Sequence, residues 1–408
     1  MAIHEHGESI MTGKRKFWSK AANIPVRAGA LAGALVAALG CAGAAHAQTA
    51  QVDDVARNAH PELAGLLDAF TITQAGAFDA IAEINSSPET MAARMELAMH
   101  LEMLANMTMR EMMAMGGHSP AEMNMDMDNP FGERESAARA TLREQLRRPH
   151  DPETAAAAFR GSASLDRRTA AIIERGRRFE RLLLDIYLDD AIGDKQAAVA
   201  EAIADYMADD IHSVASSPKN VGLLLTHDQA GAFQTGFPLL RGLLWSNQWL
   251  ELAALEAVVL EHVDSNVGGG VDTALERFWN KMGSTGGMTM FPAPVELPMA
   301  PAIAPNLYSQ SMEAAVIIDN LNVLETIVAD IMAYPNLDNR AGLIESFTAE
   351  FTNKTDNLND SMSYLLFALR GGIYNQGGPA VGELMQSERN RSRSAMDMEH
   401  AMVMSQPM

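Results

Sequence analysis

Methionine is concentrated in one stretch of this chain, where twelve methionines fall between positions 91 and 127. They are Met91, Met95, Met99, Met103, Met107, Met109, Met112, Met113, Met115, Met123, Met125 and Met127. A thioether sulfur is a soft, uncharged donor that needs no deprotonation, which suits Cu(I) in a compartment where thiols would be oxidised. Copper(I) binding is therefore the first chemistry that these residues indicate.

The first five methionines are spaced by four residues, a spacing that drifts by about 40° per step around a helix. One narrow face of such a helix combines a carboxylate, an imidazole and two thioethers. These residues are Glu96, His100, Met103 and Met107. They could form part of a metal site that a neighbouring helix completes. The alternative is ordinary packing, because methionine is a good helix former and a flexible core filler. Packing is the preferred interpretation for the helix itself.

Two further clusters lie in segments whose composition does not suit a core. The first follows the helix in a stretch rich in Gly, Asp and Asn, and the second is near the end of the chain. Their candidate ligands are Met113, Met115, His118, Met123, Met125 and Met127, and Met396, Met398, His400, Met402 and Met404. Met-x-Met spacing on a flexible chain allows two or three sulfurs to surround one Cu(I), with histidine as a further donor.

The segment from Met113 to Met127 resembles the Met/His-rich segments of bacterial periplasmic copper-resistance proteins. The resemblance covers two patches and none of the helical body. It implies copper binding or buffering but no enzyme, because the His-x-His and cysteine motifs of copper oxidases are absent. Two alternatives remain. One is a helical interaction or scaffold protein of the cell envelope with methionine-rich partner surfaces, and the other is an oxidant sink in which methionine becomes sulfoxide.

The N-terminal residues have the pattern of an export signal. Four basic residues between positions 14 and 20 precede an apolar stretch over residues 28–45, and Ala45-His46-Ala47 provides a small-x-small cleavage pattern. We expect residues 1–47 to be removed and the protein to be periplasmic. Lipoprotein processing at Cys41 is the alternative. Cys41 is the only cysteine, so the mature chain is expected to lack disulfide and thiol chemistry.

The chain is acidic, with 31 Lys and Arg against 52 Asp and Glu and a net charge of −21 at pH 7. Loss of residues 1–47, which hold five basic and two acidic residues, would leave −24. Such a chain repels phosphate backbones, so we expect metal ions and not nucleic acid as partners. The one basic stretch has six arginines between positions 167 and 181. Ion pairs within the protein are its main interpretation, and an anion-binding face is the alternative.

The residue pattern predicts an all-α fold, because helix formers dominate and alternating β-type runs are scarce. Helices are expected at residues 61–84, 90–115, 167–192, 196–214, 237–263, 307–333, 339–351, 356–369 and 380–404. The very apolar helix over 237–263 is interrupted by Arg241, Glu251 and Glu256. It is therefore expected in the core and not across a membrane.

A segment rich in proline and glycine over residues 283–306 suggests a linker between two parts of the chain. The first part is a helical region over 48–282 that contains the Met-rich helix and loop (91–127). The second is a smaller helical bundle over 307–386, followed by a Met/His-rich tail over 387–408.

No enzyme signature is present in the sequence. Phosphate loops, dinucleotide fingerprints, nucleophile elbows and zincin motifs are all absent. A minor alternative is a di-metal carboxylate bundle, for which Asp209 and His212 have the required spacing on an expected helix, with Glu256, Glu261, His262 and Asp264 as a second acidic group. The sequence predicts an exported, acidic, all-helical, non-catalytic copper-binding protein.

Overall fold

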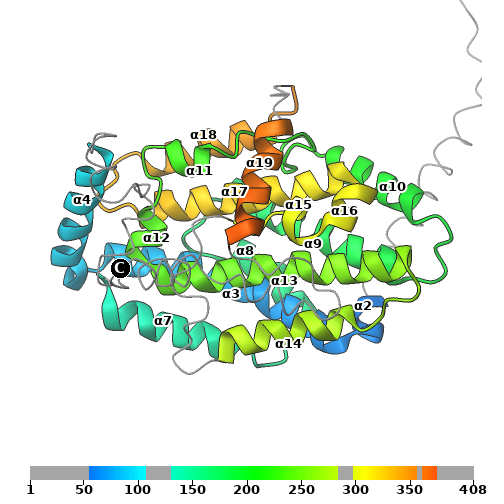
Figure 1. The fold of residues 1–408 in the computed structure, drawn as a ribbon. Coiled ribbons are helices and arrows are strands. Elements are labelled where there is room, and N and C mark those ends of the chain that lie inside the picture. The colour runs from blue at the N-terminus through cyan, green and yellow to red at the C-terminus, as the bar shows by residue number, and fades with distance from the viewer. Residues whose placement is uncertain (1–54, 107–129, 284–296, 356–360, 375–408) are drawn as a thin grey trace, which may run out of the picture. The chain divides into compact units, whose positions relative to one another are not determined.

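The computed structural model of this protein describes residues 55–106, 130–283, 297–355 and 361–374. Every regular element within these residues is a helix, which confirms the all-α prediction (Figure 1). The elements of the first half are α2 (Val55–Ala59), α3 (Pro61–Ser86), the 3₁₀ helix η1 (Pro88–Thr90), α4 (Met91–Ala105), α7 (Gly132–Gln145), α8 (Pro152–Gly161), α9 (Arg167–Leu188) and α10 (Lys195–Met207). Those of the second half are α11 (Leu223–Thr226), α12 (Ala232–Gly236), α13 (Pro238–Val263), α14 (Gly270–Gly283), α15 (Ala300–Ile303), α16 (Pro305–Gln310), α17 (Met312–Ala333), α18 (Arg340–Thr352) and α19 (Ser361–Tyr374).

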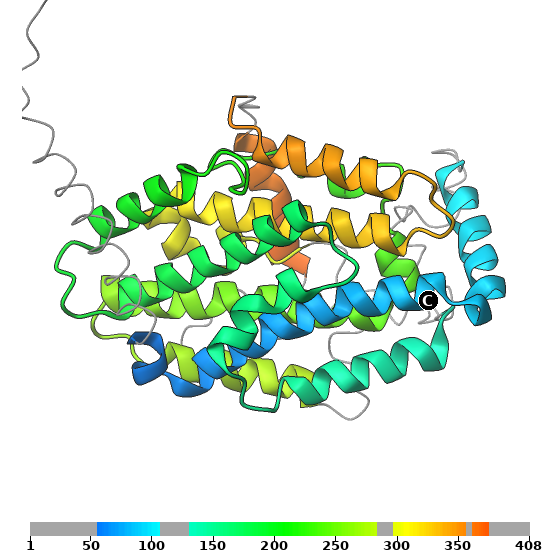
Figure 2. The same ribbon diagram turned by 180° about the vertical axis from the view of Figure 1, so that it is seen from behind.

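Two long helices, α13 and α17, form the centre of the core. Every residue of α17 from Ala314 to Ala333 is buried, and α13 is buried over most of its length. A helix that is apolar on nearly all sides needs neighbours on all sides. Helices α3 and α9 pack on both, while α18 covers α17 and α14 covers α13 (Figures 1 and 2). The expectation that the helix over 237–263 belongs to the core is thus confirmed.

The elements on the two sides of the expected linker share one hydrophobic core, which extends from Ala56 to Ala368. Helix α17, expected in a separate smaller bundle, packs against α3, α9 and α12. Residues 284–296 lie outside the described part, but the end of the proline-rich segment forms the buried helix α15. Proline at the first positions of α15 and α16 starts these helices, since its fixed φ suits a helical N-terminus. The composition therefore indicated the break between helices, but the packing continues across it.

Polar side chains end or divide several helices earlier than the sequence pattern suggested. Helix α10 ends at Met207, because the Asp209 carboxylate accepts the N–H groups of Ile211 and His212 and holds them in a turn. The helix expected over 307–333 is divided at Ser311, whose hydroxyl accepts the N–H of Ala314 and caps α17.

Among the described residues, α7, α8 and α14 are the longest helices that the sequence did not predict, and the short helices α2, α11, α12 and α15 were not expected either. Helix α8 carries a recognisable signal, because Asp151 accepts the N–H of Thr154 and Pro152 follows as the first helical residue. Helix α7 consists mostly of polar and charged residues, and Leu142 is its one buried apolar side chain. Its sequence therefore lacks the long apolar stripe that would have predicted a helix.

Candidate functional site

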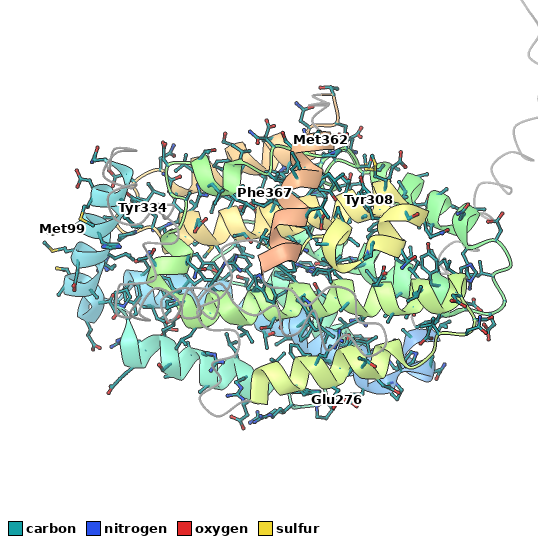
Figure 3. All side chains as sticks on the ribbon, in the orientation of Figure 1. Met99, Glu276, Tyr308, Tyr334, Met362 and Phe367 are labelled. Carbon is teal, nitrogen blue, oxygen red and sulfur yellow. The ribbon has the colours of Figure 1, made fainter. Side chains whose placement is uncertain are left out.

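Helix α4 directs leucines into the core and methionines into solvent. Leu97, Leu101 and Leu104 are buried and form the apolar stripe of this helix. The exposed side chains are Met91 (57%), Met95 (57%), Met99 (69%) and Met103 (52%). Figure 3 shows Met99 pointing away from the neighbouring helices. The preference for core packing is therefore wrong for these four methionines, because the leucines occupy the side of the helix that faces the core.

The leucine face fixes how α4 is oriented. Helix α4 crosses the direction of α3 and α13 at one end of the bundle (Figures 1 and 2). Leu97 packs directly onto the backbone of α12, since a Cβ added to Gly236 would lie 2.8 Å from Leu97 Cδ2. Arg94 donates to the carbonyl of Ser87 at 3.2 Å and ties α4 to the preceding turn. The four methionines named above are each more than half exposed, and we call them the methionine face.

The proposed mixed face of α4 is described only in part. Glu96 and Met103 are exposed, and His100 is half-buried, with its Nε2 enclosed and without a hydrogen-bond partner among the described residues. Met107 lies outside the described residues. Among the residues that the structure describes, no group of three or more His, Cys, Asp and Glu side chains is arranged to hold a metal ion. Helix α4 therefore presents thioethers and one imidazole, but no closed site.

The two methionine and histidine clusters predicted to bind copper lie outside the described residues. The cluster from Met113 to Met127 belongs to residues 107–129, and the cluster from Met396 to Met404 belongs to residues 375–408. Their part in copper binding therefore stays a prediction.

The expected helical carboxylate–histidine pair lies in a turn. His212 Nδ1 is 3.1 Å from Asp209 Oδ2, and both side chains are about one-third exposed. Acids of the second group accept local hydrogen bonds. Glu261 accepts the backbone N–H of Gly270, and Asp264 accepts the backbone N–H and the side-chain amide N–H of Asn266. The di-metal interpretation is therefore wrong for these residues, because each carboxylate holds a local turn or a helix end instead of facing a second one.

Four of the six arginines of α9 bind acids or carbonyl oxygens of the protein, which confirms the ion-pair interpretation for Arg175, Arg177, Arg178 and Arg181. Arg181 Nη2 lies 2.9 Å from Asp68 Oδ1, on α3. Arg175 donates to two carbonyl oxygens at the end of α10, at 2.7 and 2.8 Å. These contacts join α9 to its neighbours on both sides.

Arg177 is the centre of a buried ionic cluster that the sequence did not predict. Its Nη1 lies 2.8 Å from Glu180 Oε2 and 2.6 Å from Glu251 Oε2. Its Nη2 donates to Asn322 Oδ1 at 3.1 Å and to Glu325. All four charged side chains are at most 7% exposed. The cluster joins α9, α13 and α17 at their contact.

One guanidinium serves three carboxylates in this cluster, so burial dominates their protonation. Burial raises the pKa of Glu180, Glu251 and Glu325 above the usual range, although Arg177 acts in the opposite direction. Burial lowers the pKa of Arg177, but the three carboxylates outweigh it and hold this pKa well above its usual value. The cluster therefore has one permanent cation and acids that keep protons to higher pH than exposed acids do.

Two more buried acids cap short helices. Glu256 accepts the backbone N–H groups of Asn306 and Leu307 at the start of α16. Asp319 accepts the N–H of Ala300 at the start of α15 and the hydroxyl of Tyr364 at 2.6 Å. Burial raises the pKa of each acid to about 7. The available sequence signal for each is an acid that interrupts an otherwise apolar helix.

No helix of the described residues is both long enough and apolar enough to cross a membrane.

Comparisons with known protein families, curated proteins and solved structures find no match to this chain.

Proposed function

We propose that this chain binds or buffers Cu(I) in the periplasm, without catalysing a reaction, through the methionine face of α4 and the Met/His-rich segments. The observation that supports this proposal most directly is the exposure of four regularly spaced thioethers on a well-formed helix. Full burial of a methionine side chain stabilises a protein by roughly 1.5–3 kcal/mol. Each of the four exposed methionines of α4 lacks much of this stabilisation. Packing therefore does not explain why methionine occupies these positions.

The chemistry of the face suits a soft cation. Residues four apart on a helix are neighbours, about 6 Å apart along the axis, and the methionine side chain is long and flexible enough to converge on a shared ion. Thioether and imidazole are ligands that Cu(I) accepts, and His100 lies on the same helix. Met107 follows two residues after the end of α4, and the cluster from Met113 to Met127 comes next in the chain. Helix α4 would contribute some ligands, and these segments would complete the coordination.

An anaerobic Cu(I) titration against a chromogenic Cu(I) chelator tests this proposal on the chain from residue 48 to 408. Deleting residues 112–127 and 396–408 is expected to lower the number of bound Cu(I) ions. Replacing Met91, Met95, Met99 and Met103 with leucine in the intact chain is expected to weaken the remaining affinity. Leucine keeps the size and the helix preference of methionine but has no sulfur.

A matched control uses exposed methionines elsewhere in the structure. Met312 is 42% exposed and Met362 is 65% exposed, on α17 and α19. Replacing both with leucine makes the same chemical change outside the methionine face and is expected to leave Cu(I) binding unchanged. If the double deletion binds as much Cu(I) as the intact chain, the proposal is wrong.

The alternative is a helical scaffold protein of the cell envelope, for which the methionine face would be a partner surface. The leucine variant also separates these functions, because leucine preserves an apolar contact and removes only the sulfur. Retained partner capture together with absent Cu(I) binding in the intact chain would favour the scaffold. An oxidant sink would instead show as preferential sulfoxide formation at these four positions in peptide mass maps after peroxide treatment.

A further inference from the structure

A pocket of about 170 Å³ lies where α2, α3, α8 and α9 meet. Helix α8 packs against both α3 and α9, on the side seen in Figure 2. The α8 wall consists of small residues, Pro152, Ala155 and Ala156, which leave the space open. The opposite walls carry four arginines, from α2 and α9: Arg57, Arg177, Arg178 and Arg181. A concentration of cations is unexpected in a chain with a net charge of −21.

Each of two acids in this pocket is shared by two arginines. Asp68 lies 2.8 Å from Arg57 Nη2 and 2.9 Å from Arg181 Nη2. Asp68 is only 4% exposed and its two partners are 32% and 19% exposed, so this bridge is largely enclosed. One carboxylate neutralises one guanidinium, and the bridge therefore retains one positive charge.

The second bridge has the same composition. Glu174 Oε1 lies 2.5 Å from Arg178 Nη2, and Glu174 Oε2 lies 2.7 Å from Arg160 Nε. Glu174 is 8% exposed, whereas Arg178 and Arg160 are 68% and 63% exposed. Only Arg178 of these two arginines lines the pocket. Among the side chains that line the pocket, four arginines accompany two acids, Asp68 and Glu174, which leaves a surplus of two positive charges.

Arg177 is the most buried of the four arginines that line the pocket, at 5% exposure. Its terminal nitrogens bind the buried carboxylates described above, while its Nε is buried and has no hydrogen-bond partner in the described part of the chain. Those carboxylates oppose an anion, but burial raises the pKa values of Glu180, Glu251 and Glu325 and so reduces their negative charge. The guanidinium fork is the group best suited to planar or tetrahedral oxyanions, because it donates two parallel hydrogen bonds.

We propose that this pocket binds a small dianion, an oxyanion or a dicarboxylate, between the Asp68 and Glu174 bridges. The surplus of two charges sets the charge of the ligand, and the small volume excludes a polymer or a large organic molecule. The site goes beyond the copper function proposed above and uses none of its residues.

Isothermal titration calorimetry of the chain from residue 48 to 408 tests the site with sodium sulfate, sodium phosphate and disodium succinate. Ionic strength is held constant with sodium chloride, so that chloride is the monovalent reference anion. Calorimetry is preferable to thermal stability, because sulfate and phosphate stabilise proteins through exclusion from their surface. Saturable binding with one ion per chain is the expected result for at least one dianion. Succinate binding without sulfate or phosphate binding would identify a dicarboxylate, and the converse an inorganic oxyanion.

Two matched variants show whether binding is local. Arg178→Gln removes a guanidinium that lines the pocket and is expected to weaken binding by about tenfold, the effect of losing one charge-assisted hydrogen bond. Arg160→Gln removes the other partner of Glu174, which has similar exposure but does not line the pocket, and is expected to have a clearly smaller effect.

A third variant is expected to strengthen dianion binding instead of weakening it. Glu174→Gln releases Arg178 from its competing carboxylate and is expected to tighten binding severalfold. Circular dichroism checks that each variant keeps its helical content. Absence of saturable binding for all three dianions, or equal weakening by Arg178→Gln and Arg160→Gln, would overturn the proposal.

Discussion

Arg177 and its three carboxylates place four ionisable side chains in the core at the contact of α9, α13 and α17. Desolvating charges is costly, and the attraction between them compensates only when geometry is good and the remaining polar atoms are bound. Asn322 satisfies part of this need by accepting from Arg177. The cluster therefore specifies how the three helices meet more than it adds to stability. Removing Arg177, its only cation, would leave three buried carboxylates without an opposite charge in the cluster.

Arg177→Met is accordingly expected to destabilise the protein by about 3–5 kcal/mol at pH 7. The loss should shrink as pH falls, because the three carboxylates then take up protons. Urea unfolding followed by circular dichroism measures both effects. Arg178→Met is the control, since Arg178 is 68% exposed and its ion pair should contribute at most about 1 kcal/mol. Equal stability of the two variants at pH 7 would contradict this account of the cluster.

At the scale of elements, close helix contacts depend on glycine at particular positions. A Cβ added to Gly176 of α9 would lie 2.3 Å from Leu321 Cδ2 of α17. Leu321 is fully buried, so its side chain has little room to move. Gly65 of α3 differs, because a Cβ there would meet nothing within 4 Å. The same residue type thus allows close approach of two helices at one site and only lowers helix propensity at the other.

Gly176→Ala is expected to cost about 1–3 kcal/mol through overpacking, although alanine is the better helix former. Gly65→Ala should instead stabilise the protein by up to about 1 kcal/mol, because it restricts the unfolded chain without a clash. Chemical unfolding of the two single variants provides the comparison. A stabilised Gly176→Ala variant would show that α9 and α17 pack less closely than the contact between Gly176 and Leu321 implies.

At the scale of the whole molecule, an acidic chain keeps several acids in its core, and this affects how stability varies with pH. Burial raises the pKa of Asp319 from 3.8 and that of Glu256 from 4.5, each to about 7. Between about pH 4 and pH 7, the folded protein therefore holds protons that the unfolded chain has released. Because the unfolded state binds fewer protons over this range, the contribution of each group to stability falls as pH rises.

Asp319→Asn combined with Glu256→Gln should remove this dependence, since the amides resemble the protonated acids. We expect the stability of the double variant relative to the parent to increase from pH 4.5 to pH 7 and then to level off. The increase should be at most about 1.4 kcal/mol per pH unit for each group. Urea unfolding across this pH range measures it. Asp205→Asn, which removes an exposed carboxylate of α10, controls for the loss of a negative charge. A parallel pH dependence in variant and parent would contradict the prediction.

Much of the fold could be predicted from local pattern. The long apolar helix α13, the arginine-rich helix α9 and the amphipathic helix α3 followed from composition and periodicity, because those features act within one element. The candidate site was less predictable. The spacing of the α4 methionines was evident, but whether they face the core or solvent depends on α12, since Leu97 of α4 packs against Gly236.

The sequence by itself determined that this protein is all-helical and acidic, and that its thioethers are grouped where a soft metal ion could be bound. Helix propensity, net charge and ligand chemistry are properties of residue types and need no partner. Only the tertiary structure decided that the methionine face is exposed, that α17 shares the core with α3 and α9, and that arginines of α9 line a pocket with acids of two helices. These features arise between residues far apart in the chain, and the position of each partner is set by packing and desolvation in the folded state.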